Sequence, residues 1–276
     1  MKPAAPTRLG IAKPISLEGV GVHTGVRSGV TLLPGSNGIS VARVDGRRKN
    51  FAISPTTARP SPLCTLLVGS TGATLSTVEH LFSALHGMGV TDVMVEVDGP
   101  EVPILDGSAL PWVTALETAG LTPLPGPLDT LKVASTVPLA DGARTLFATP
   151  AGLFSVRCTI DFDHPMIGHQ SWSGTITPER YKKEIAPART FITEDELKLA
   201  QEAGFAKGAT LEGGVLFLND GTVANPGGLR FEDEPVRHKV LDAIGDLFMA
   251  GKPVVGAFTL NRPGHTANNA LLRKLV

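Results

Sequence analysis

Residues 230–246 read R-F-E-D-E-P-V-R-H-K-V-L-D-A-I-G-D, a stretch with the pattern of an amphipathic helix. Pro235 follows three acidic residues, and Gly251 lies just beyond the far end of the pattern, so a helix is predicted over 235–250. At about 100° per residue, one side of this helix is apolar. It carries Val236, Val240, Leu241, Ala243, Ile244, Leu247 and Phe248.

The opposite side of the same helix carries His238, Asp242 and Asp246, each one turn after the last. An imidazole and a carboxylate four residues apart can point at one ion, and a third group one turn on can support them. A bare H-x-x-x-D pattern is more often a solvated polar face with a chance histidine. This stretch alone leaves both interpretations open.

Length and composition restrict the class of protein. The chain has 276 residues, of which 42% are apolar and 18% charged, so it can bury a substantial core in an α+β fold of one or two domains. A formal net charge of -1 gives no sign of a nucleic-acid surface or a polybasic membrane anchor. No signal peptide or membrane span is expected. Two cysteines, Cys64 and Cys158, lack metal-type spacing, and a reducing cytoplasmic compartment is the simpler expectation.

A second helix is predicted where S-T-V-E-H, residues 76–80, leads into L-F-S-A-L-H-G. Ser76 and Glu79 have the spacing of a capping box, and Gly87 is a suitable C-terminal stop. Glu79 could instead be a carboxylate that acts on metal-bound water beside a ligand, His80. His86 lies about 120° around the helix from His80 and is a poor co-ligand. A zinc protease is disfavoured, since neither H-E-x-x-H nor H-x-x-E-H occurs.

The order of predicted elements repeats. A helix, a strand over 92–97, a loop and a helix over 108–119 recur as the helix over 235–250, a strand over 253–260, a loop and a helix from Thr266. This order predicts an internal duplication of an α+β unit. The boundary is expected in T-P-L-P-G-P, residues 122–127, which divides the chain into domains 1–125 and 126–276. Residues 1–13 are expected to be a loose tail.

Five sequence blocks occur in a fixed order between residues 76 and 269, and the resemblance that they carry extends over nearly the whole chain, from about Ile15 to Leu272. They are S-T-V-E-H-L, V-D-G-P-E-V-P-I-L-D-G-S-A, A-R-T-F, G-L-R-F-E-D-E-P-V-R-H-K-V-L-D-A-I-G-D-L and G-A-F-T-L-N-R-P-G-H-T-A-N-N. Together they resemble the UDP-3-O-acyl-N-acetylglucosamine deacetylases, the zinc amidases of early lipid A synthesis in Gram-negative bacteria. The resemblance implies two duplicated βα sandwich domains with helices packed between the sheets. It also implies an active site in the cleft between the domains and an insert near 191–218 that forms an acyl passage.

The resemblance assigns a metal site and a base. Zinc would be held by His80, His238 and Asp242, with one position left open for water. Two histidines and one aspartate could also accept Fe²⁺. Glu79 matches the general base that takes a proton from the water.

Further roles follow from the same resemblance. His265 matches a cationic histidine that stabilises the oxyanion and protonates the leaving amine, and Asp246 matches its carboxylate partner. Thr190 matches a hydroxyl that supports the tetrahedral intermediate. Substrate contacts are implied for Lys239, for Phe162 near the nucleotide and sugar, and for Phe191 in the acyl passage.

The chain departs from the family pattern in the insert. Ile192 and Thr193 follow A-R-T-F where the family commonly has Gly and another bulky residue, and residues 208–214 read G-A-T-L-E-G-G. Glu194 and Lys207 place charges near the passage, so these side chains must point outward or shorten it. Its apolar lining is expected from Phe191, Ile192, Leu197, Phe205, Leu211 and Val215. Cys64 matches a position near the metal, as a competing thiolate or as a buried structural cysteine.

The expected function is metal-dependent hydrolysis of the N-acetyl amide of UDP-3-O-(3-hydroxyacyl)-N-acetylglucosamine, which releases acetate. A related metal amidase with altered acyl or sugar preference remains an alternative. A catalytically silent protein that binds the nucleotide-sugar lipid is another, although such a binder needs no water-activating carboxylate. A monomer is the family default.

Overall fold

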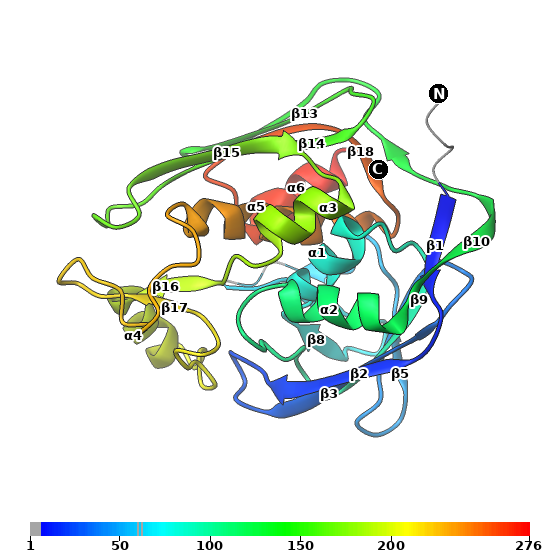
Figure 1. Ribbon diagram of the computed structural model, residues 1–276, viewed down its shortest axis with the longest axis horizontal. Coiled ribbons are helices and arrows are strands. Elements are labelled where there is room, and N and C mark those ends of the chain that lie inside the picture. The colour runs from blue at the N-terminus through cyan, green and yellow to red at the C-terminus, as the bar shows by residue number, and fades with distance from the viewer. Residues whose placement is uncertain (1–6, 60, 62) are drawn as a thin grey trace.

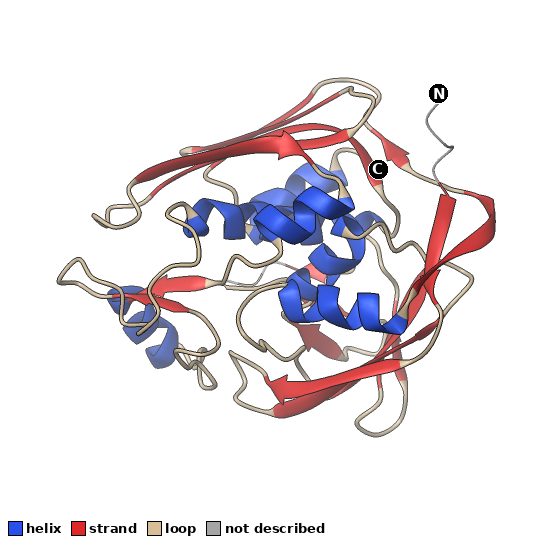
Figure 2. Cartoon of the chain, viewed as in Figure 1, coloured by secondary structure: helices blue, strands red, loops and turns tan. Residues whose placement is uncertain are grey.

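Two β-sheets enclose a layer of helices in the computed structural model, which describes residues 7–59, 61 and 63–276 (Figures 1 and 2). Four helices form most of this layer: α1 Glu79–Gly87, α2 Leu110–Ala119, α5 Glu234–Leu247 and α6 His265–Arg273. The core between the sheets is apolar and close-packed, with Trp112, Phe82, Phe248 and Phe258 among its largest fully buried side chains. The predicted α+β class, with helices packed between sheets, is confirmed.

The two sheets have the same topology. One runs in the order β2-β3-β9-β4-β5 and the other in the order β12-β13-β18-β14-β15, with β11 beside β18. The first is built from β2 Ile15–Val20, β3 Arg27–Pro34, β9 Val93–Asp98, β4 Ile39–Arg43 and β5 Lys49–Phe51. The second is built from β12 Val137–Asp141, β13 Arg144–Thr149, β18 Val254–Asn261, β14 Phe154–Asp161, β15 His169–Thr175 and β11 Leu131–Lys132.

In each five-strand order one pair of neighbours is parallel, β4 with β9 in the first sheet and β14 with β18 in the second, and the other neighbours are antiparallel. The additional strand β11 is parallel to β18. Parallel neighbours need a crossover connection, and the two crossovers contain α1 and α5 respectively. We call β2 to α2 the first repeat and β12 to α6 the second repeat. The predicted duplication is confirmed, and it places α1 and α5 at equivalent positions.

Helices α1 and α5 approach each other closely in the middle layer. An added Cβ at Gly245 of α5 would lie 2.0 Å from the backbone oxygen of Glu79 on α1, so only glycine fits at this crossing. The C-terminal end of α5 continues into a 3-10 turn, η2 Phe248–Ala250, and Gly251 follows with φ 74°. The predicted helix over 235–250 is therefore confirmed together with its glycine stop.

The expectation of a loose tail is wrong for the described part of residues 1–13. It includes a strand, β1 Thr7–Ile11, which pairs antiparallel with β10 Leu121–Pro127. The expected boundary stretch over 122–127 lies in this two-stranded ribbon, where prolines are tolerated at the unpaired edge. Residues 1–6 of the tail lie outside the described residues. The division at residue 125 stays a prediction.

The insert forms a small unit beside the two repeats (Figure 1). It consists of β16 Phe191–Thr193 and β17 Val215–Phe217, which pair in parallel, and α4 Glu194–Glu202. Thr193 caps α4 through a capping box with Glu196. This local role accounts for the threonine at a position where the family pattern is different.

The remaining elements are short. They are β6 Ala58–Arg59, β7 Leu66–Val68 and β8 Thr74–Ser76 in one sheet, and α3 Pro178–Arg180 followed by the π-helical turn η1 Tyr181–Ile185. None of the described helices combines the length and apolar character required to cross a bilayer.

Candidate active site

A cavity of about 600 Å³ opens between the insert, α1, α5 and the start of α6. Nine of the ten side chains predicted for the site line it: Glu79, His80, Phe162, Thr190, Phe191, His238, Lys239, Asp242 and His265. The tenth, Asp246, is fully buried and contacts His265. The structure thus brings together residues that are far apart in the sequence.

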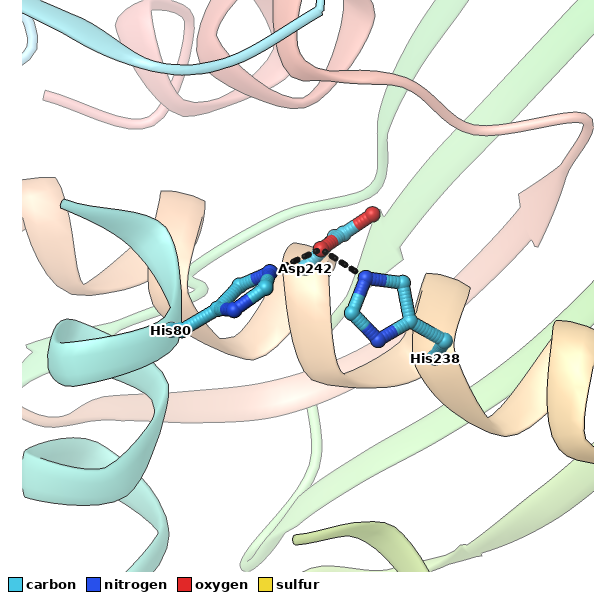
Figure 3. A group of neighbouring side chains, drawn as sticks. All are labelled: His80, His238 and Asp242. Carbon is cyan, nitrogen blue, oxygen red and sulfur yellow. Dashed lines mark ion pairs between the residues drawn. The ribbon is translucent and has the colours of Figure 1, made fainter. Parts of the chain in front are cut away.

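Three potential metal ligands meet at this cavity (Figure 3). His80 comes from α1, whereas His238 and Asp242 lie one turn apart on α5. One donor atom from each residue lies within 4.8 Å of the others. The Asp242 Oδ1 atom is 3.2 Å from His238 Nε2 and 3.8 Å from His80 Nε2. All three residues are buried, so the alternative of a solvated polar face is wrong.

The protonation of the three groups suits a divalent cation. The Nδ1 atom of His238 lies 3.0 Å from the carbonyl oxygen of Ala188, which can only accept, so Nδ1 carries a proton and Nε2 is the ring nitrogen left to face a cation. Burial, together with the neighbouring His238, lowers the pKa of His80 to about 3 and keeps it neutral. Two imidazoles and one carboxylate are a donor set that fits Zn²⁺ or Fe²⁺.

The carboxylate of Asp242 has a second partner. Burial alone would raise the pKa of Asp242, but His238 and Lys239 hold it well below its usual range. The ammonium group of Lys239 donates to Asp242 Oδ2 at 2.9 Å. Asp242 is therefore an anion that can offer Oδ1 to a cation while Oδ2 remains hydrogen-bonded.

Glu79 lies at the first position of α1, beside the ligand His80. The predicted capping box is wrong, because Val78 is the N-cap and no side chain caps the helix. The Glu79 side chain instead accepts the backbone N–H of Thr65 at 3.1 Å and points toward His265, with Oε1 3.7 Å from Nε2. Burial raises the pKa of Glu79 to about 8, and His265 partly opposes this. A divalent cation nearby would favour the ionised form.

His265, at the start of α6, forms a dyad with Asp246. Its Nδ1 atom lies 3.0 Å from Asp246 Oδ2. Burial alone would lower the pKa of His265, but the carboxylates of Asp246 and Glu79 raise it to about 10. The imidazole is therefore a cation at neutral pH, with Nε2–H directed toward Glu79.

Thr65 and Asn268 complete this dyad and were not identified from the sequence. The Thr65 hydroxyl donates to Asp246 Oδ1 at 2.5 Å, and Asn268 Nδ2 donates to Asp246 Oδ2 at 2.8 Å. Both residues are buried. The only local signal for Asn268 is the A-N-N triplet at 267–269, and no sequence motif marks Thr65, which directly precedes β7.

The aromatic and polar lining of the cavity lies next to the triad. Lys239 Nζ is 5.3 Å from the centre of the Phe191 ring, which is itself in edge contact with Phe162. Thr190 is fixed by two backbone hydrogen bonds, to Gly107 and from Val215. Its position is thus set by the segments on either side of the insert.

The insert contributes apolar side chains to the cavity, namely Phe191, Ile192, Leu197, Leu211 and Val215. Phe205, predicted to join them, is not in this lining and contacts the ring of His23. Glu194 pairs with Lys198 and, like Lys207, is not among the residues that line the cavity. The two charges expected near the passage are therefore not in its lining, and Glu196 of α4 is the charged residue of the insert that is.

Cys64 is a buried thiol close to Glu79. Burial, with Glu79 adding to it, raises the pKa of Cys64 to about 12. Without a metal ion beside it Cys64 is therefore a protonated thiol, which favours the structural alternative over a competing thiolate.

Comparison with known proteins agrees with this geometry. The family model for UDP-3-O-acyl N-acetylglycosamine deacetylase matches residues 8–276. The UDP-3-O-acyl-N-acetylglucosamine deacetylase of Myxococcus xanthus is 39% identical over 279 residues, which cover 100% of this chain and 88% of that protein. The deacetylase of the same name from Anaeromyxobacter dehalogenans is 41% identical and covers 96% of this chain and 86% of its own. That of Haemophilus influenzae is 38% identical, with coverage of 95% and 87%. The chain belongs to the UDP-3-O-acyl N-acetylglycosamine deacetylase family.

Proposed function

We propose that this protein hydrolyses the N-acetyl amide of UDP-3-O-(3-hydroxyacyl)-N-acetylglucosamine and releases acetate, as a step of lipid A biosynthesis. The observation that carries the proposal is the convergence of three elements on one cavity: the His80–His238–Asp242 triad, the Glu79 carboxylate and the His265–Asp246 dyad. Relatives named UDP-3-O-acyl-N-acetylglucosamine deacetylase align with nearly the whole chain.

Zn²⁺ is the proposed ion, and once bound it would polarise the amide carbonyl and increase the acidity of a water molecule. Glu79, which lines the cavity next to His80 at the start of α1, would accept the proton of that water. His265 carries a positive charge and an Nε2–H group directed into the site, which suits stabilisation of the oxyanion and protonation of the departing amine. Asp246 keeps this imidazole charged and oriented.

The remaining predicted residues would bind substrate. Lys239 presents an ammonium group over the Phe191 ring, and Phe162 is in edge contact with that ring. Thr190 would place its hydroxyl near the developing oxyanion. We propose that the acyl chain lies along the apolar lining of the insert, next to Ile192 and Leu197.

The cellular context is part of the proposal. Cys64 and Cys158 are both free and buried, which supports a reducing, cytoplasmic compartment. The monomeric state and the domain boundary at residues 125 and 126 remain predictions.

The direct test is mass-spectrometric detection of acetate loss from UDP-3-O-(3-hydroxyacyl)-N-acetylglucosamine. The protein would be assayed with Zn²⁺, with a chelator and with Fe²⁺, on substrates of several acyl lengths. Chelator-sensitive release of acetate is the expected result. Folded, metal-loaded protein that binds the substrate without releasing acetate at any length would instead identify the silent binding protein.

A further inference from the structure

Glu234 is a buried carboxylate at the first turn of α5, one turn before the proposed ligand His238. Its side chain is 1% exposed. A buried carboxylate is costly unless its oxygens are hydrogen-bonded. Here Oε1 accepts from the backbone N–H and the Nε of Arg189, each at 2.9 Å, and Oε2 accepts from Arg189 Nη2 at 3.0 Å and from the backbone N–H of Arg230 at 2.7 Å.

One of these bonds connects Glu234 to the metal site. The backbone N–H of Arg189 and the carbonyl of Ala188 belong to the same peptide group. On one side this group donates to Glu234 Oε1 at 2.9 Å, and on the other its oxygen accepts from His238 Nδ1 at 3.0 Å. The result is an uninterrupted chain of hydrogen bonds from a carboxylate, through one peptide, to an imidazole.

Peptide resonance allows the charge of Glu234 to affect His238 through this series of hydrogen bonds. An anion at the N–H group favours the resonance form with more negative charge on the carbonyl oxygen. That oxygen then accepts more strongly from Nδ1–H, which increases the basicity of the opposite ring nitrogen. A carboxylate hydrogen-bonded directly to a ligand histidine has the same effect in many metal sites.

We propose that Glu234 is a positioning residue for the metal site and acts on His238 through the Ala188–Arg189 peptide. It fixes the Nδ1–H tautomer and the ring orientation, and it makes Nε2 a stronger ligand. The inference rests on His238 being a metal ligand, as stated under the proposed function.

Neighbouring contacts hold the Ala188–Arg189 peptide in place. Ala188 is fully buried, and the Arg230 guanidinium donates to the carbonyl of Pro187 at 2.8 Å and to Asp106 at 2.9 Å. The segment 187–190 is therefore held at successive residues against the start of α5. Thr190, at its end, lines the cavity.

The test is the substitution Glu234→Gln, which keeps the shape of the side chain and one acceptor oxygen but removes the charge. Metal affinity of the purified protein would be measured by competition with a chromophoric chelator, with Zn²⁺ and with Co²⁺. We expect binding to weaken roughly 10- to 100-fold, the usual effect of losing the hydrogen-bond partner of a ligand histidine.

Asp233→Asn is the matched control. Asp233 precedes Glu234 at the same helix end and pairs with Arg237, but no hydrogen bond connects it to the Ala188–Arg189 peptide among the described residues. The Asp233→Asn substitution removes one negative charge from the N-terminal end of α5, as Glu234→Gln does. We expect its metal affinity to stay within about threefold of wild type, because the relay through the peptide is intact.

A second readout separates positioning from general stability. In metal-free protein, the ring-nitrogen shifts of His238 and the exchange rate of its Nδ1–H proton would be measured by NMR, with the signal assigned by its loss in His238→Ala. The wild type should show a slowly exchanging Nδ1–H tautomer. Glu234→Gln should shift that resonance and accelerate its exchange, whereas Asp233→Asn should not.

The outcomes distinguish this inference from the proposed function. Equal metal affinity and unchanged His238 resonances in folded Glu234→Gln would overturn the relay. If Glu234→Gln does not fold, the NMR measurement on the wild type still tests the relay. A wild-type His238 whose proton is on Nε2 rather than Nδ1 would overturn it. Metal binding that survives His238→Ala would instead show that the proposed metal site is wrong.

Discussion

Glu79 and His80 are adjacent in the chain but have different proposed tasks. Glu79 is not one of the three clustered ligands, and its carboxylate faces His265. Substitution of Glu79 by Gln should therefore leave the metal in place and remove the proton acceptor. We expect turnover to fall by roughly 10²- to 10⁴-fold, the usual contribution of a general base. Acetate release and metal content by mass spectrometry would both be measured.

His238→Ala provides the contrasting case, because this residue is one of the clustered ligands. Its metal content should fall along with its turnover. Turnover of Glu79→Gln within a few-fold of wild type would show that another group activates the water.

The His265–Asp246 dyad predicts how activity depends on pH. Asp246 and Glu79 raise the pKa of His265 to about 10 although burial opposes this. If the imidazolium is the active form, activity is present below that pKa and lost as pH rises through it. Asp246→Asn removes the larger of the two carboxylate effects, so the alkaline limb of the kcat/KM profile should move to lower pH.

Two results would bear on this directly. Asp92→Asn, a substitution of a buried aspartate bonded to Arg8 rather than to His265, should leave the alkaline limb where it is. An unshifted limb in Asp246→Asn would show that the ionisation of His265 does not control the reaction.

At the scale of elements, the crossing of α1 and α5 depends on one glycine. Substitution of Gly245 by Ala gains up to about 1 kcal/mol of helix propensity. The new methyl group would lie 2.0 Å from the Glu79 backbone oxygen, however, and the two helices must separate. Overpacking of this kind costs about 1–3 kcal/mol, so a net loss of stability is expected. Because the ligands lie on both helices, metal affinity should fall as well.

Chemical unfolding and chelator competition would measure the two losses in Gly245→Ala. Gly152→Ala is the control, since no atom lies within 4 Å of an added Cβ there. Wild-type metal affinity in folded Gly245→Ala would show that the separation between α1 and α5 is not critical for the site.

Some elements could be predicted from the sequence because their signals are local. The helix over 235–250 has an apolar face, a proline start and a glycine stop, and α5 with its 3-10 turn confirms it. The capping box at Ser76 failed because Ser76 ends β8 and the helix begins only at Glu79, whose side chain accepts from the backbone of Thr65 instead. The ribbon of β1 and β10 was missed because it pairs segments more than a hundred residues apart.

For the site as well, residues in local sequence motifs could be predicted, whereas residues that contribute through contacts distant in the sequence could not. Side chains carried by long motifs, such as His238 and His265, could be assigned from the sequence. Thr65 could not, because it contributes through a contact made only when the two repeats pack together. The Ala188 carbonyl could not either, because it meets His238 across 50 residues of the second repeat. The repeated strand order explains this packing, since it places α1 and α5 at equivalent positions in the middle layer.

A metal held at this site would connect the two repeats. His80 lies on α1 in the first repeat, and His238 and Asp242 lie on α5 in the second. Binding to the folded state alone stabilises it by about 2.7 kcal/mol at a free metal concentration of 100 times Kd. For a chain of this size we expect Tm to rise by about 5–10 °C on addition of Zn²⁺ and to fall again with chelator.

Calorimetry of single-ligand variants would show whether the metal connects the repeats. The Zn²⁺-dependent rise in Tm should be lost in His80→Ala as well as in His238→Ala, because each removes a ligand from one side. Asp233→Asn should keep it. If His80→Ala retained the full rise while His238→Ala lost it, α5 alone would hold the ion. The repeats would then be joined only by the close packing of α1 against α5 at Gly245.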